Sequence, residues 1–226
     1  MGETMPSNPF AAKYLVAAVL LTVAINILTI ATARWAAGSD TEQIVTAALS
    51  MAQAQRGGMS DAQREGAASM MRPMIQFYPV TTAIGVLIML LVVATVFYGA
   101  LAITDAGLRW PVVFGAATYA ALAQATGGLL LTGVLAAARP PTALQLVDGS
   151  FLSTNLGAVL PESLGPVLLA GARTFDALTL VFLMVFVAML GSYGNSRVSE
   201  KTMGIVVGVC FAIWVVIRMG WAAIFG

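Results

Sequence analysis

Few side chains in this sequence could carry acid–base or nucleophilic chemistry. The 226 residues contain no histidine, so the commonest metal ligand and general base is missing. The single cysteine, Cys210, stands among apolar residues, which keep a thiol protonated and unreactive. Ser199 and Lys201 offer only a weak combination of a nucleophile with a base. We therefore expect no catalytic residue, no metal and no cofactor, and we predict that the chain is not an enzyme.

Three ionisable residues stand within or beside long apolar runs, where a charge needs a partner or a function. Asp176 lies 21 residues before Arg197, and Arg218 lies 17 residues after Lys201. If the turn between Arg197 and Lys201 joins antiparallel helices, Asp176 and Arg218 lie within about a turn of each other. We predict an Asp176–Arg218 ion pair, with Arg173 as a competing partner. A role in fixing helix register is favoured, and a polar element of a transport path is the alternative.

Other residues in apolar surroundings suggest packing between helices. The amides of Asn26, Gln124 and Asn155 are expected to form interhelical hydrogen bonds, and a substrate pocket lined by them is the alternative. Gly204 and Gly208 form a GxxxG pattern, which favours close approach of a second helix in this chain or in another copy.

The elements that position these residues follow from the distribution of charge. Hydrophobic residues make up 59% of the chain and charged residues only 9%, against about 25% charged in soluble domains. Charge-free runs occur at 14–33, 73–104, 110–138, 177–196 and 202–217. A bilayer core needs about 20 apolar residues of helix, a length that the last run reaches only if Arg218 lies in the membrane. The net charge of +1 gives no reason to expect a nucleic-acid partner.

We therefore predict an all-α fold, a single domain over residues 1–226 that forms a polytopic membrane bundle. Its five spans are expected at about 10–33, 76–104, 111–138, 173–193 and 202–225.

The polar connections between the spans differ in kind. Residues 39–72 are expected to form a helical hairpin outside the hydrocarbon, with capping boxes at Ser39 with Glu42 and at Ser60 with Gln63. The stretch 142–172 is interrupted by prolines and glycines, which predicts interfacial or re-entrant segments.

Positive charges near the ends of the spans give an orientation. The short turns with Arg109 and with Arg197 and Lys201 fall on the same side as Lys13. Because short loops count most in the positive-inside rule, we expect a cytoplasmic N-terminus and an outside C-terminus.

Several stretches resemble one family. They are NLGAVLP at 155–161, RTFDALTL at 173–180, SRVSEKT at 196–202, RMGWAA at 218–223 and the acidic helix at 59–65. Together they resemble bacterial members of the Yip domain family, which is named for eukaryotic members that interact with Rab-type GTPases. The resemblance implies five spans, a cytoplasmic N-terminus and a bacterial inner-membrane location. Only about ten residues precede the first span, so we do not expect GTPase binding to carry over.

Two functions are compatible with these features. The favoured one is a non-enzymatic membrane protein that associates with a membrane protein partner or with itself, as a scaffold, accessory subunit or membrane-organising factor. The alternative is a small transporter, channel or lipid-handling protein with a polar site between its spans.

Overall fold

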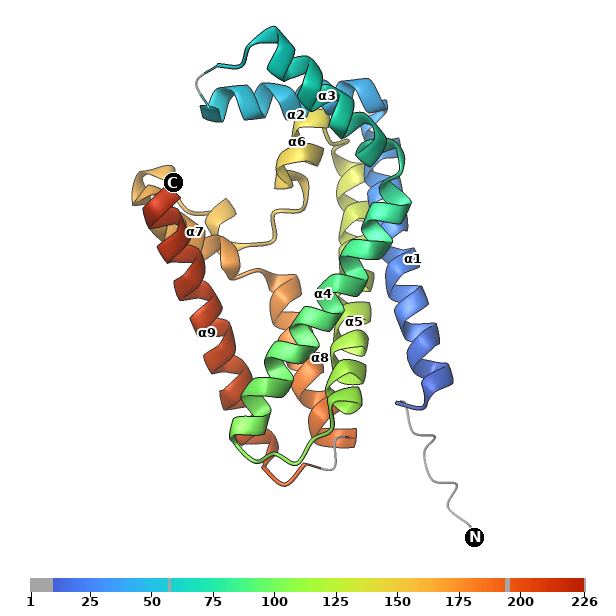
Figure 1. Cartoon of the computed structure of the whole chain (residues 1–226), viewed down its shortest axis with the longest axis vertical. Coiled ribbons are helices and arrows are strands. Elements are labelled where there is room, and N and C mark those ends of the chain that lie inside the picture. Colours follow the sequence, from blue (N-terminus) through green and yellow to red (C-terminus); the bar gives the residue numbers. More distant parts are fainter. Residues whose placement is uncertain (1–9, 57, 194–195, 226) are drawn as a thin grey trace. The chain divides into compact units, whose positions relative to one another are not determined.

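The structure is a computed structural model that describes residues 10–56, 58–193 and 196–225, and within these residues every regular element is a helix (Figure 1). The long helices are α1 (Ala12–Ala37), α2 (Thr41–Arg56), α3 (Asp61–Gln76), α4 (Tyr78–Ile103), α5 (Trp110–Ala138), α8 (Ala177–Tyr193) and α9 (Glu200–Phe225). The shorter ones are α6 (Ala143–Asp148), α7 (Gly165–Thr174) and the 3-10 turns η1 (Ser150–Leu152), η2 (Leu156–Ala158) and η3 (Glu162–Leu164).

Among the described residues, four helices are long and apolar enough to cross a membrane: α1, α4, α5 and α9. The predicted all-α fold is therefore confirmed and four of its helices are candidate membrane spans, but a fifth span is not confirmed. The sequence raised a doubt about the length of the last span, but the helix that is too short to count as a span is α8, with 17 residues. Helix α9 continues through Arg218 without a break, so its length does not depend on where that side chain lies.

The chain, expected to form one domain, divides into two compact units. Unit 1 contains residues 1–22, 87–124 and 154–226, and unit 2 contains residues 23–86 and 125–153. The boundaries fall inside α1, α4 and α5, so each of these helices contributes to both units.

Unit 1 is held together by aromatic and small side chains. Phe186 of α8 is completely buried and packs against Phe97 of α4 at 4.8 Å between ring centroids. Helix α9 packs against both α7 and α8. At one end of the unit, the backbone N–H of Arg197 donates to the carbonyl of Ala106 at 2.9 Å, and Arg197 pairs with Asp105. The turn between α4 and α5 therefore lies beside the turn that precedes α9.

Unit 2 is built around the polar helices α2 and α3, which pack against each other through Val45, Leu49 and Ala68. Helix α6 packs against α2. The predicted capping box of Ser60 with Gln63 is confirmed at the start of α3, because both of its hydrogen bonds are formed.

The other predicted box is wrong by one residue. The residues that cap α2 reciprocally are Asp40 and Gln43, with hydrogen bonds of 2.8 and 3.1 Å, and not Ser39 and Glu42. This shift leaves the Glu42 carboxylate available for a partner on α3.

Candidate functional site

A cavity of about 440 Å³ lies within unit 2 and is partly open to the surface. This volume is in the usual range of about 300–1,000 Å³ for small-molecule sites. Its walls come from α1, α2, the junction of α3 with α4, and α6 with the turn after it. Most of the lining is apolar, and its larger members are Ile30, Ile44, Ile75, Leu146, Phe151 and Leu152.

One charged side chain, Arg34, stands in this lining among the residues that the structure describes. Its guanidinium is held in place from three sides. Nη1 donates to the carbonyl of Ile75 at 3.0 Å, Nη2 donates to Oγ1 of Thr41 at 3.4 Å, and the ring of Tyr78 lies 5.1 Å away in a cation–π contact. The position of this cation is therefore fixed by α2, α3 and α4 together.

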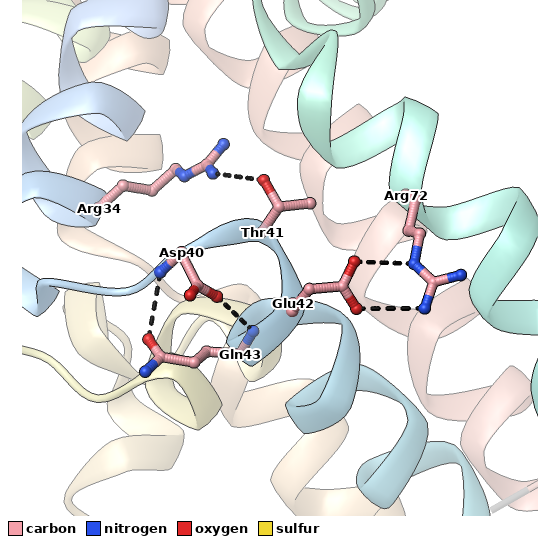
Figure 2. A network of polar contacts seen from close by, with 6 residues as sticks. All are labelled: Arg34, Asp40, Thr41, Glu42, Gln43 and Arg72. Atoms are coloured by element: carbon pink, nitrogen blue, oxygen red, sulfur yellow. Dashed lines mark hydrogen bonds and ion pairs between the residues drawn. The ribbon is translucent and has the colours of Figure 1, made fainter.

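The two acidic residues that flank Thr41, Asp40 and Glu42, bind other residues and not Arg34 (Figure 2). Asp40 accepts from the backbone N–H of Gln43, and Glu42 forms a two-bond ion pair with Arg72 at 2.8 and 3.2 Å. The hydrogen bond that Arg72 donates to the Glu42 carboxylate raises the pKa of Arg72 above its usual value. In the described part of the chain, the ion pairs are Arg72–Glu42 and Arg197–Asp105, so Arg34 has no carboxylate partner.

The predicted cluster around Asp176 has a different geometry from the one expected. The Asp176 carboxylate accepts from Thr154 Oγ1 at 2.8 Å and from the backbone N–H groups of Leu178 and Thr179 at 2.7 and 3.3 Å. Asp176 therefore caps the start of α8. An antiparallel bridge between Asn155 and Asp176 ties this cap to the segment before η2.

The expected Asp176–Arg218 ion pair is not formed. Neither Arg218 nor Arg173 is in an ion pair among the described residues, and both side chains are exposed. The physical reason is that the carboxylate already accepts hydrogen bonds from the Thr154 hydroxyl and from two backbone N–H groups at the start of α8, so it needs no guanidinium partner.

The remaining predicted residues are spread over the two units. Asn155 is in the broken segment of unit 1, and its buried Oδ1 has no hydrogen-bond partner among the described residues. Asn26 lies in unit 2 and Gln124 in unit 1, both half-buried, and neither lines the cavity.

Within this chain, the GxxxG pair of Gly204 and Gly208 does not produce close packing. A Cβ atom added at Gly204 would lie 3.9 Å from Val187, an ordinary contact, and one added at Gly208 would meet nothing within 4 Å. The close approaches are elsewhere: a Cβ atom at Gly157 would lie 2.4 Å from Arg173 Cγ, and one at Gly171 would lie 2.9 Å from Met219 Sδ.

Arg34 is the site residue that sequence reasoning missed. A signal was present, because Arg34 and Trp35 follow an apolar run and Tyr78 opens the next one, the pattern of residues at a membrane interface. The cavity itself is formed by residues that lie far apart in the sequence, so no local pattern could have shown it.

The described residues contain no group of three or more Asp, Glu or Cys side chains that could hold a metal ion. Comparison of the chain with protein-family models, curated proteins and solved structures gives no match. Membership of the Yip domain family therefore stays a prediction from the residues quoted above. The class that the fold defines is broader: a helical chain with the long apolar helices of an integral membrane protein.

Proposed function

We propose that this chain is a non-enzymatic integral membrane protein that acts by associating with a membrane protein partner, as a scaffold, accessory subunit or membrane-organising factor. We place it in a bacterial inner membrane, with a cytoplasmic N-terminus and with α2 and α3 outside the hydrocarbon. This placement follows the resemblance to the Yip domain family and the distribution of basic residues in the short turns.

The observation that carries the proposal is an apolar stripe on α3. Met70, Met74 and Phe77 recur at helical spacing at the end of this polar helix, and their exposed fractions are 74%, 62% and 58%. The face that α3 turns toward α2 is already filled by Ala68, Met71 and other residues, so the stripe is additional. Exposed methionines suit a contact surface because the thioether side chain adapts to different partners.

The test is purification from native membranes through an affinity tag, with the wild type compared with a Met70→Ser, Phe77→Ser double variant, which leaves the lining of the cavity unchanged. We expect one or more membrane proteins to copurify with the wild type in constant ratio and to be reduced at least several-fold with the double variant. The matched control is Arg64→Gln with Glu65→Gln, which changes two exposed residues on the same helix and should leave copurification unchanged. Repeated recovery of the protein alone would count against association.

A lipid-handling role is the second candidate, favoured by the cavity in unit 2. The residues expected to line such a site, Asn26, Gln124 and Asn155, are not among those that line the cavity. What supports this candidate is an apolar space with one fixed cation at Arg34. Reconstitution in vesicles with a fluorescent phospholipid would test it, because lipid handling predicts faster exchange between leaflets than protein-free vesicles show.

A further inference from the structure

The Arg34 guanidinium has hydrogen-bonding capacity to spare. A guanidinium carries five N–H donors, and two of them are used by Ile75 and Thr41. Within the described residues no acid neutralises it, since Asp40 and Glu42 point to Gln43 and Arg72 (Figure 2). A half-buried cation beside an apolar cavity is complementary to a ligand that joins an anionic group to an apolar body.

The surroundings of Arg34 indicate where this complementarity operates. Trp35 is 84% exposed at the end of α1, and Tyr78 is the first residue of α4. Trp and Tyr residues at the ends of apolar helices typically lie at the headgroup level of a bilayer. Arg34 would then lie at headgroup depth, and Thr29, which also lines the cavity, would lie about 7 Å deeper along α1.

We propose that this cavity binds an anionic phospholipid of the surrounding membrane, with the phosphate held by Arg34 and part of an acyl chain along the apolar wall. Guanidinium matches phosphate geometry well, and the hydroxyl of Tyr78 and the amide of Gln145 are further polar groups in the lining. The inference depends on the proposed membrane placement of α1 and α4, but not on a protein partner.

The occupant follows from charge and depth together. A soluble anion such as inorganic phosphate would leave the apolar wall of Ile30, Ile44 and Phe151 in contact with water. A helix from another protein would need an acidic side chain at headgroup depth. An anionic phospholipid satisfies the cation and the apolar wall at once and is supplied by the bilayer itself.

The experiment uses the full chain, purified in detergent and analysed by native mass spectrometry with two phospholipids of identical acyl chains. One is phosphatidylglycerol, which is anionic, and the other is phosphatidylcholine, which is zwitterionic. We expect the wild type to bind phosphatidylglycerol preferentially. Arg34→Gln should weaken phosphatidylglycerol binding by about tenfold and phosphatidylcholine binding clearly less, because the choline cation of phosphatidylcholine already offsets the charge of its phosphate.

Two further variants distinguish binding of the lipid headgroup from binding of its acyl chain. Arg139→Gln removes an exposed arginine of the same unit that does not line the cavity, and it should change neither affinity. Thr82→Trp fills part of the cavity from α4 and should weaken both lipids together. An equal loss of phosphatidylglycerol binding in Arg34→Gln and Arg139→Gln would overturn the proposal, because it would show attraction by overall charge alone.

A measurement on the wild type keeps the proposal testable if Arg34→Gln does not fold. Phosphatidylglycerol that carries a photoreactive diazirine on its acyl chain should label peptides that contain residues 29–34 and 74–82. Labelling confined to other peptides would refute the site. Because the protein is purified, a negative result here is independent of whether a protein partner copurifies from membranes.

Discussion

The carboxylate of Asp176 already accepts hydrogen bonds from three donors. Of the two residues in the expected ion pair, we therefore expect Asp176 to stabilise the fold and Arg218 not to. We predict that Asp176→Ala lowers the free energy of unfolding by about 1–2 kcal/mol, the usual range for loss of a helix cap. Arg218→Met should leave the free energy of unfolding unchanged within about 0.5 kcal/mol, because its exposed side chain has no ion-pair partner in the described structure. Thermal unfolding in detergent, followed by circular dichroism, measures both.

The double variant separates this account from the ion pair expected from the sequence. If Asp176 and Arg218 act independently, the two effects add. A destabilisation of similar size in both single variants, with no further loss in the double variant, would show that the pair forms in the membrane after all. Thr154→Val provides a related check, because it removes one of the three donors to Asp176 and should cost about 1 kcal/mol.

At the residue scale, the sequence predicted local patterns better than it predicted partners. The Ser60–Gln63 box could be predicted because both of its hydrogen bonds join residues three apart in the chain. The shift from Ser39 to Asp40 could not, since two adjacent residues can both cap a helix and the choice depends on how the chain leaves α1. The residues around Arg34 come from three other helices, so the local pattern of Arg34 and Trp35 could indicate a membrane interface but not these partners.

At the scale of elements, two glycines differ in the space around them: Gly208 of α9 has open space, whereas Gly157 of η2 is closely packed. We predict that Gly208→Ala stabilises the protein by about 0.5–1 kcal/mol, because alanine favours helix and the structure leaves open space at this position. Gly157→Ala should destabilise it, because an added Cβ would lie 2.4 Å from Arg173 Cγ and 3.1 Å from the Arg173 backbone nitrogen. Denaturation of the two variants side by side provides the comparison.

The opposite result for Gly208→Ala would indicate that this face of α9 contacts a second copy of the chain. If Gly208→Ala destabilised the protein in membranes or changed its oligomeric state, the GxxxG face would be a contact between copies. Gly133→Ala, on α5, is the control, since it also meets nothing within 4 Å and lies outside the GxxxG pattern.

The elements also show where apolar length fails as a predictor. Long runs without charge located α1, α4 and α5 within a few residues of their bounds. The sequence predicts a span at 173–193, yet α8 begins only at Ala177 and has 17 residues. Its start is set by the Thr154–Asp176 hydrogen bond and the bridge at Asn155, long-range contacts that periodicity does not contain.

For the whole molecule, the number of spans depends on whether α7 and α8 together run along the full length of α9. Phe175, between α7 and α8, packs edge-on against Phe211 near the middle of α9, with ring centroids 5.4 Å apart. Gly171 of α7 lies against Met219, further along the same helix. Helix α8 therefore accompanies the first half of α9 and α7 accompanies much of the second. From this arrangement we propose that α7 and α8 form one broken span, because a break in a membrane helix is tolerated where protein surrounds it.

The number of spans fixes the relation between the two termini. With five spans the N-terminus and the C-terminus lie on opposite sides of the membrane, whereas with α1, α4, α5 and α9 alone they lie on the same side. We predict opposite sides, with the N-terminus cytoplasmic. Cysteine accessibility in intact cells can measure this in a Cys210→Ala background, with a cysteine placed in a tag at either terminus and a membrane-impermeant maleimide as the label. The C-terminal cysteine should react before lysis and the N-terminal one only afterwards.

Two internal positions make the topology experiment decisive. A Ser60→Cys variant reports on the start of α3 and should react from outside, whereas Gly107→Cys in the turn between α4 and α5 should react only after lysis. If Gly107→Cys is poorly tolerated because of its positive φ, Arg109→Cys provides the same information. A C-terminal cysteine protected together with Arg109→Cys, while Ser60→Cys reacts, would mean that α7 and α8 turn back without crossing. The break at Asp176 would then be the tip of a re-entrant loop, and the five-span topology would have to be abandoned.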